Sequence, residues 1–304
     1  MAKGTRSLGA STGLQRLVDE IEADPSLTAP DRFRERIDAL DRLDTYSLDT
    51  QILLAGSASS LAALHACAVA LRTKLEGANS EFYQGVRDAI RRGAGRDVLL
   101  RWDSLPKREA PSHDGTTPAD ADSYDYLDEL VSGVFRFAVT DEPKANLSAE
   151  MVAYQPTPAR HVFDLIRRMQ LTEQDVFFDL GSGLGHVPLL VAICTGARCV
   201  GVELEPSYVK CARNSAQELS LANATFLTQD AREADLSSGK VFYLYTPFRG
   251  AILRAVLDRL RLEALTREIR VCTFGPCTPI VAAESWLMLD SEELRHISVF
   301  RSRR

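Results

Sequence analysis

No hydrophobic run in the 304-residue sequence is long enough to cross a membrane, which takes about 20 continuously apolar residues. The most apolar stretch, residues 57–75, is rich in alanine and interrupted by polar side chains, so it predicts a buried helix. The residues after Met1 also lack the apolar core of a secretory signal. We therefore expect a cytoplasmic protein without a membrane span.

An excess of positive charge is missing as well. The sequence has 36 Lys and Arg residues against 42 Asp and Glu residues, a formal net charge of −6 at pH 7. Binding to nucleic acid or anionic lipid would therefore need a local basic patch, and the charge balance argues against a nucleic-acid partner. The nearest feature to such a patch is a loose group of arginines: Arg249, Arg254, Arg259, Arg261, Arg267 and Arg270.

The cysteines lack the spacing of a metal site. No two are separated by two residues, as zinc ligands commonly are, and no histidine lies near the two pairs that are five positions apart. Without a secretory signal they are best interpreted as reduced, mostly buried thiols, so we expect no metal. The six are Cys67, Cys194, Cys199, Cys211, Cys272 and Cys277.

The first 110 residues show only helical patterns, with apolar side chains three and four positions apart. Helices are predicted at residues 14–21, 33–43, 57–75 and 80–92. The composition then shifts to Pro, Ser, Asp, Gly and Thr over residues 106–122, which is typical of a linker. We therefore predict a helical bundle or cap at 1–110, a linker and lip at 111–150, and a second domain at 151–304.

The linker region is acidic. Residues 112–130 contain six acids and no Lys or Arg, which indicates either a solvated segment or a lip that attracts a cationic substrate. The acids are Asp114, Asp120, Asp122, Asp125, Asp128 and Glu129.

After residue 151, strand and helix patterns alternate. This alternation predicts parallel strands joined by right-handed crossovers, a doubly wound α/β sheet. Strands are predicted at residues 175–180, 199–203, 224–227, 241–245 and 269–274, helices at 184–194, 207–219 and 252–262, and a hairpin at 286–289 and 294–300.

A glycine-rich loop follows the first of these strands. Its glycines are Gly181, Gly183 and Gly185, so the spacing is GxGxG, whereas dinucleotide-binding enzymes show GxGxxG. Asp179 lies two residues before the first glycine, where a carboxylate suits an amine-bearing ligand and repels a pyrophosphate. The loop therefore favours a cationic ligand over NAD.

Acids also follow the next two strands. Glu203 ends the second strand, where a carboxylate can accept both hydroxyls of a ribose, and Asp230 and Ala231 follow the third, where an acid and a backbone amide can bind adenine edges. The carboxyl ends of parallel strands meet at one edge of the sheet, where open α/β folds bind ligands.

This arrangement resembles the class I (seven-strand, Rossmann-like) S-adenosylmethionine-dependent methyltransferases over residues 151–304. The resemblance implies S-adenosylmethionine as cofactor. It also implies that Asp179 and the loop Gly181, Ser182, Gly183, Gly185 hold its methionine part, that Glu203 holds the ribose, and that Asp230 and Ala231 lie at the adenine.

A segment before the first strand, Tyr154-Gln155-Pro156-Thr157-Pro158, gives a narrower resemblance. It is similar to a segment in the non-SET histone-lysine methyltransferases and in the mitochondrial lysine methyltransferases of the ATP-synthase c-subunit. That resemblance implies that Tyr154 and Thr157 fold over the cofactor. The alternative is a proline that merely starts a helix.

A segment after the fourth strand, Tyr245-Thr246-Pro247-Phe248, is similar to the N-P-P-F/Y or N-P-F signature of amine and amide methyltransferases. The resemblance makes these four residues the candidate catalytic segment. The Asn of the signature is missing, and Tyr245 or Thr246 stands in its place with a hydroxyl that can accept a hydrogen bond.

Methyl transfer needs alignment, exclusion of water and an unprotonated nucleophile. Tyr154, Tyr243, Tyr245 and Phe248 are candidates to line an apolar channel that favours a neutral amine, although core packing is the alternative and the one we favour for Tyr243. We expect His186, a lone histidine after the glycine loop, to be structural.

Three functions stay open. The first is methylation of a protein lysine. The second is O- or N-methylation of a small molecule, with the helical region as a lid. The third is a non-catalytic cofactor-binding module. The sequence does not indicate an oligomeric state.

Overall fold

The computed structural model describes residues 2–53, 59–105, 124–137, 150–151, 154–290 and 297–303. The chain divides into two compact units, Met1–Val86 and Arg87–Arg304. Most of the predicted linker lies outside the described residues. None of the described helices is both long and apolar enough to cross a membrane.

The first unit is helical, as expected. Its core combines Leu14, Leu17 and Val18 of the first helix with Leu43 of the second and Leu75 of the third. The elements are α1 (Ala2–Ala23), the 3-10 turns η1 (Pro25–Thr28) and η2 (Pro30–Arg32), α2 (Phe33–Leu53), and α3 (Ser59–Arg91), which continues into the second unit.

Helix α3 corrects two sequence predictions. Residues 57–75 and 80–92 were predicted as separate helices, but a single helix, Ser59–Arg91, spans nearly all of the described part of both, since an isolated glycine such as Gly77 costs only about 1 kcal/mol in a helix. Residues 62–74 of its alanine-rich part are half-buried or exposed, because only one side of the helix contributes to the core.

A buried arginine joins α2 to the rest of the first unit. Arg36 donates hydrogen bonds to Asn79 Oδ1 (2.5 Å) and to the carbonyl oxygens of Leu27 (2.7 Å) and Ala29 (2.9 Å). Its guanidinium also lies 5.7 Å from the ring centroid of Phe33. Such extensive pairing offsets the cost of burying the charge.

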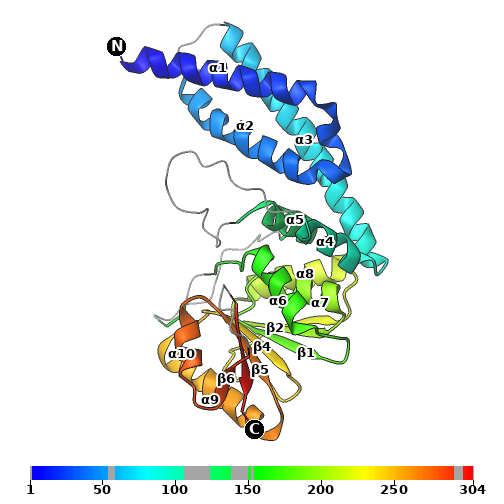
Figure 1. The fold of residues 1–304 in the computed structure, drawn as a ribbon, viewed down its shortest axis with the longest axis vertical. Helices are drawn as coiled ribbons and strands as arrows, with labels where there is room; N and C mark the ends of the chain where they lie inside the picture. The colour runs from blue at the N-terminus through cyan, green and yellow to red at the C-terminus, as the bar shows by residue number, and fades with distance from the viewer. Residues whose placement is uncertain are drawn as a thin grey trace. The chain divides into compact units, whose positions relative to one another are not determined.

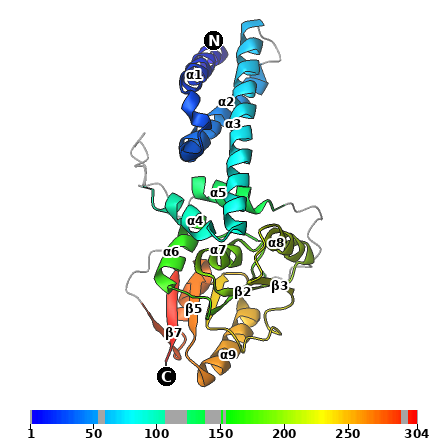
Figure 2. The same ribbon diagram turned by 90° about the vertical axis from the view of Figure 1, so that its right-hand side faces the viewer.

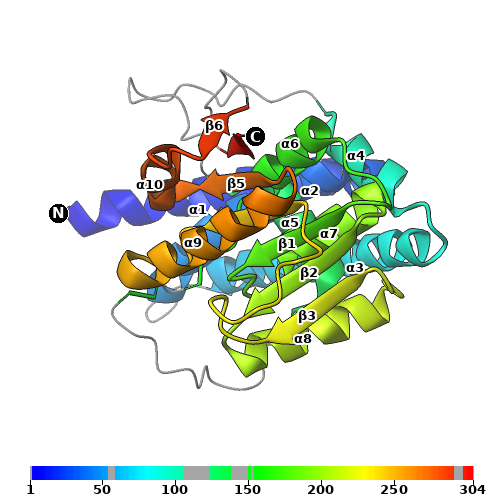
Figure 3. The same ribbon diagram turned by 90° about the horizontal axis from the view of Figure 1, so that it is seen from below.

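The second unit is built on a seven-stranded sheet in the order β3-β2-β1-β4-β5-β7-β6 (Figure 3). The first five strands pair in parallel, and β7 and β6 close the edge antiparallel, so the predicted doubly wound fold is confirmed. The strands are β1 (Val176–Leu180), β2 (Arg198–Glu203), β3 (Ala224–Thr228), β4 (Val241–Tyr245), β5 (Arg270–Phe274), β6 (Leu287–Leu289) and β7 (Ser298–Ser302).

Helices cover both faces of this sheet: Figures 1 and 2 show α6 (Ala159–Met169), α7 (His186–Thr195) and α8 (Pro206–Glu218) on one face and α9 (Gly250–Thr266) on the other. Phe178 and Phe242 pack toward α9 in one core cluster. Because side chains alternate along a strand, the neighbouring Asp179 and Tyr243 belong to the opposite face.

Three helices were not predicted: α4 (Gly95–Asp103), α5 (Tyr126–Phe135) and α10 (Thr278–Ala282), which follows the 3-10 turn η4 (Gly275–Cys277). Helix α5 lies in the acidic run that was interpreted as a linker or lip. Asp125 and Asp128 form a capping box at its start, so these two acids stabilise a helix end. Of the other four acids, Glu129 also lies in the first turn of α5, and Asp114, Asp120 and Asp122 lie outside the described residues.

Candidate functional site

A cavity of about 320 Å³ lies at the carboxyl ends of β1, β2 and β4. All of the predicted site residues except Gly183 and Gly185 line it. The lining set is Tyr154, Thr157, Asp179, Gly181, Ser182, Glu203, Asp230, Ala231, Tyr245, Thr246, Pro247 and Phe248.

The glycine loop is shaped by its contacts as well as by its backbone. Gly181 has a φ of +92° and Gly183 a φ of +52°, a region that side chains disfavour. A Cβ atom on Gly181 would clash with Pro247, and one on Gly183 would clash with the ring of Tyr154. The loop therefore brings two other predicted site segments into direct contact with it.

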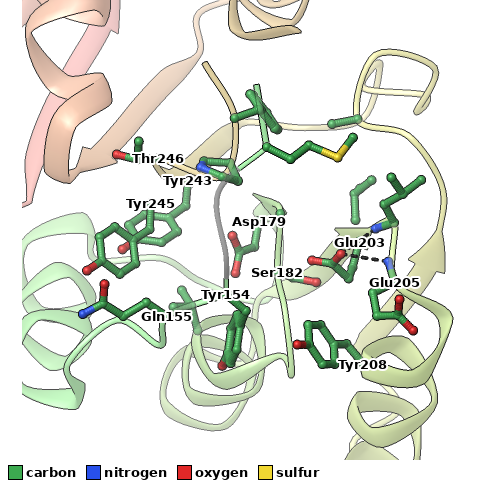
Figure 4. A pocket seen from close by; sticks show the side chains of 18 of the residues that line it. Tyr154, Gln155, Asp179, Ser182, Glu203, Glu205, Tyr208, Tyr243, Tyr245 and Thr246 are labelled. Atoms are coloured by element: carbon green, nitrogen blue, oxygen red, sulfur yellow. Dashed lines mark hydrogen bonds between the residues drawn. The ribbon is translucent and has the colours of Figure 1, made fainter. Parts of the chain in front are cut away.

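Glu203 organises the turn after β2. Its Oε1 accepts hydrogen bonds from the backbone amides of Leu204 (2.7 Å) and Glu205 (2.9 Å), drawn as dashed lines in Figure 4. Its Oε2 accepts from the amide of Gly183 at 2.9 Å, so one carboxylate ties the end of β2 to the glycine loop.

Asp179 lies at the centre of the cavity (Figure 4). It is 4% exposed, and burial together with the nearby charge of Glu203 raises the pKa of its carboxyl well above the usual range. Within the described part of the chain no group donates a hydrogen bond to it. The hydroxyl of Ser182 is also buried with no hydrogen-bond partner among the described residues.

We call residues Tyr154–Pro158 the strap, and its first four residues, Tyr154–Thr157, line the cavity. The Tyr154 hydroxyl lies 2.7 Å from Nδ1 of His186, and the Thr157 hydroxyl lies 2.7 Å from that of Tyr243. Burial lowers the pKa of His186 to about 4, so the imidazole is neutral near pH 7. His186 is thus a structural partner of Tyr154.

The segment Tyr245–Phe248 also lines the cavity. Thr246 has a φ of +38°, which is uncommon for a β-branched residue and is often found at functional sites. Its hydroxyl donates to the carbonyl oxygen of Phe274 (3.1 Å) and accepts from the amide of Cys277 (3.0 Å). The hydroxyl therefore fastens this segment to η4.

Two aromatic residues belong to the cavity and to the core at once. Phe248 packs with Ile252 in the core cluster under α9, and Tyr243 is 1% exposed beside Asp179. Core packing was the favoured interpretation of Tyr243, yet its hydroxyl bonds to the strap.

Asp230 faces a different partner from the expected ligand. Its carboxylate accepts hydrogen bonds from the backbone amide of Arg232 (2.8 Å) and from the guanidinium of the same residue (2.7 Å). Hydrogen bonds from that side chain lower the pKa of Asp230. Ala231 is buried against the core.

Most arginines of the loose group form ion pairs or hydrogen bonds with other parts of the protein. Arg254 pairs with Glu284 and Asp258, Arg259 donates to backbone carbonyls, Arg267 donates to the carbonyl of Gly239 (2.9 Å), and Arg270 donates to that of Met169 (3.4 Å). Four of the six arginines are therefore held by partners within the protein.

The sequence that forms much of this cavity matches the model of a known protein family. The model of the family "Histone methylation protein DOT1" matches residues 148–242, which include the strap, the glycine loop and Glu203. This chain is a class I S-adenosylmethionine-dependent methyltransferase.

Solved structures of other methyltransferases are similar to part of the chain. An RNA methyltransferase from Salinibacter ruber, in complex with S-adenosylhomocysteine, is 30% identical (TM-score 0.38) over 49% of this chain and 92% of its own. A precorrin-6y C5,15-methyltransferase from Geobacter metallireducens is 16% identical (TM-score 0.40) over 51% of this chain and 93% of its own.

A tRNA (uracil-54, C5)-methyltransferase from Pyrococcus abyssi is 18% identical (TM-score 0.38) over 49% of this chain, which spans only 39% of that protein. A search of curated proteins gives no significant match.

The residues of the methyltransferase's cavity fit its cofactor. The buried carboxylate of Asp179 has no donor in the described protein and suits the ammonium group of the methionine part. The buried Ser182 hydroxyl likewise has no partner in that region, and the glycine loop leaves no room for a Cβ at two positions. The cofactor is S-adenosylmethionine.

Sequence reasoning missed several residues that line this methyltransferase's cavity, notably Gln155, Glu205 and Tyr208. The ring centroid of Tyr208 lies 5.3 Å from that of Tyr154. Glu205 accepts hydrogen bonds from the amide (3.0 Å) and hydroxyl (2.6 Å) of Ser207 at the start of α8. Glu205 could have been found from the sequence, because Glu205-Pro206-Ser207 is a signal for the start of a helix. The position of Tyr208 follows only from the way α8 crosses from β2 to β3.

Proposed function

We propose that this methyltransferase transfers a methyl group to the side-chain nitrogen of a lysine in a protein. The observation that supports this most is the match to the histone-methylation family model over residues 148–242. That stretch contains the strap, the glycine loop and Glu203, which all contribute to the cavity.

In this proposal Asp179 and Ser182, two buried groups of the cavity without a hydrogen-bond partner among the described residues, hold the methionine part of the cofactor. Asp179 pairs with its ammonium group, Ser182 donates to its carboxylate, and Glu203 accepts from the ribose hydroxyls. Asp230 and Ala231 lie at the adenine, where the Arg232 contact leaves the backbone amide of Ala231 as the simpler hydrogen-bond donor.

The part of the cavity where we expect the methyl acceptor to bind has a composition suited to an amine. Tyr243, Tyr245, Pro247 and Phe248 line it with apolar surface, which disfavours a charged ammonium and so favours loss of its proton to solvent before transfer. When bound, S-adenosylmethionine supplies the methyl group: the nitrogen lone pair forms the N–C bond while the C–S bond breaks and leaves its electron pair on sulfur. The protein's part is to align the amine and to exclude water.

Incubation of the enzyme with radiolabelled cofactor and a host lysate tests the proposal. We expect label in protein, and methyl-lysine after acid hydrolysis of the labelled band. Label in RNA or in the organic extract, with unlabelled protein, would contradict lysine methylation and in the latter case indicate a small-molecule acceptor. The Asp179→Asn variant serves as a background control. The expected cytoplasmic location stays a prediction, which fractionation of the host would check.

A further inference from the structure

The missing Asn of the Tyr245–Phe248 segment raises the question of which group orients the acceptor nitrogen. Thr246 does not supply it, since its hydroxyl is buried and bonds to both Phe274 and Cys277. Tyr245 packs its ring against that of Phe274, with centroids 4.6 Å apart. The segment itself therefore offers no side-chain amide.

Another residue that lines the same cavity carries an amide. Gln155 belongs to the strap, lines the cavity and is directed toward Tyr243 and Tyr245 (Figure 4). The strap is anchored on both sides of it, by the 2.7 Å contact of Tyr154 with His186 and the 2.7 Å contact of Thr157 with Tyr243. Its backbone is therefore held in place.

The backbone beside this amide is held as well. The hydroxyl of Tyr124 donates to the carbonyl oxygen of Pro156 at 2.7 Å. The side chain of Gln155, which lines the cavity, carries a carbonyl oxygen, Oε1, that can accept a hydrogen bond from a group bound there.

We propose that Oε1 of Gln155 accepts a hydrogen bond from the acceptor nitrogen and thereby replaces the missing Asn. The ligand class is a neutral primary or secondary amine, since such a nitrogen carries both a proton to donate and a lone pair to attack. An amide oxygen accepts the hydrogen bond without removing the proton, so Gln155 positions the amine and is not a base. The inference rests on the proposed function, which supplies the amine.

The test compares Gln155→Leu with Gln217→Leu, a matched change on the exposed surface of α8. The probes are core histones and the protein band labelled in the lysate. We expect transfer by Gln155→Leu to fall about tenfold or more at saturating cofactor, the effect of one lost hydrogen bond at the reacting atom. The affinity for S-adenosylhomocysteine should stay within about twofold of wild type, and Gln217→Leu should behave as wild type.

A second variant separates positioning from a structural role. Adding Thr246→Asn to Gln155→Leu places an amide in the segment Tyr245–Phe248, at a left-handed position that Asn tolerates better than Thr. We expect this double variant to regain part of the lost transfer. Unchanged transfer by Gln155→Leu would overturn the inference, and so would a loss of cofactor affinity that matches the loss of transfer.

Failure of the proposed function gives a different result. If the wild-type enzyme labels a non-protein acceptor, the lysine proposal fails, and the Gln155 variants are then assayed on that acceptor. A tenfold loss on a nitrogen acceptor would still support the role of Gln155, whereas methylation of oxygen or carbon would overturn it.

Discussion

At the scale of single residues, Asp179 and Glu203 are two neighbouring carboxylates with opposite consequences for the fold. Asp179 is buried without a hydrogen-bond donor among the described residues, so its charge is unfavourable until a cation binds. Glu203 accepts three backbone hydrogen bonds and holds the glycine loop to β2. Asp179 is therefore available for ligand binding, whereas Glu203 also stabilises the glycine loop.

We predict that Asp179→Asn raises the melting temperature of the ligand-free protein, because it removes a buried charge, and weakens S-adenosylmethionine binding at least tenfold. Glu203→Ala should weaken binding by a similar factor but lower the melting temperature, since its amide partners lose about 1–3 kcal/mol in total. Thermal melts and titration calorimetry check both variants. Wild-type affinity in Asp179→Asn would contradict the assignment of this residue to the cofactor.

His186 predicts a pH dependence of stability. Its folded pKa is about 4, below the ordinary 6.5, so the unfolded chain binds more protons between these values and stability falls as the pH drops from 6.5 to 4. The loss from this group is at most about 3 kcal/mol. His186→Phe should reduce the difference between free energies of unfolding at pH 7 and pH 5. An unchanged difference would mean that other groups control acid stability.

At the scale of elements, the strap is held to the sheet by the hydrogen bond between Thr157 and Tyr243. Removing one partner leaves the other buried and unsatisfied, whereas removing both leaves neither. We therefore predict that Thr157→Val and Tyr243→Phe each destabilise the protein by about 1–3 kcal/mol and that the double variant costs less than their sum. Denaturant unfolding of the wild type, the two single variants and the double variant measures this coupling. Additive changes in the free energy of unfolding would show that the hydrogen bond does not hold the strap to the sheet.

The Thr157→Val variant also tests whether the strap contributes to cofactor binding. A looser strap places Tyr154 less well over the glycine loop, so Thr157→Val should weaken cofactor binding as well as stability. Calorimetry provides this measurement. Thr157→Ser, which keeps the hydroxyl, is the control that should bind as wild type.

At the scale of the whole molecule, every residue that lines the cavity lies in the unit Arg87–Arg304. We predict that a fragment of residues 87–304 binds S-adenosylmethionine within about threefold of the full chain, because its buried contacts are its own. A shorter fragment from residue 123 should be less stable, since it lacks α4, whose Leu99 and Trp102 are buried. Equal stability of the two fragments would contradict this.

The predicted division into a helical region, a linker at 111–150 and a catalytic domain remains our proposal for the domain organisation. Residues 106–122, where proteolysis is expected to cut first, lie outside the described residues. Cleavage elsewhere, with protection of this stretch, would contradict that proposal.

Local chemistry allowed the sequence alone to determine the doubly wound sheet and the cofactor loop. The apolar strands, the positive φ values that Gly181, Gly183 and Gly185 permit, and the acids at strand ends all depend on residues close together in the chain. The continuity of α3 and the presence of α5 were not predicted, because glycine and acidic residues were interpreted without knowledge of what they contact.

Only the tertiary structure decided which of the candidate groups remain available to a ligand. Thr246 bonds to Phe274, Asp230 to Arg232, and Asp128 to the amide of Ala159, while Gln155 lines the same cavity as the segment that lacks the amide. A polar side chain forms whichever hydrogen bonds the fold brings within about 3 Å. The hydrogen-bond partners of Thr246 and Asp128 are distant from them in the chain, and so are the residues that share the cavity with Gln155. The residue pattern therefore could not show these contacts.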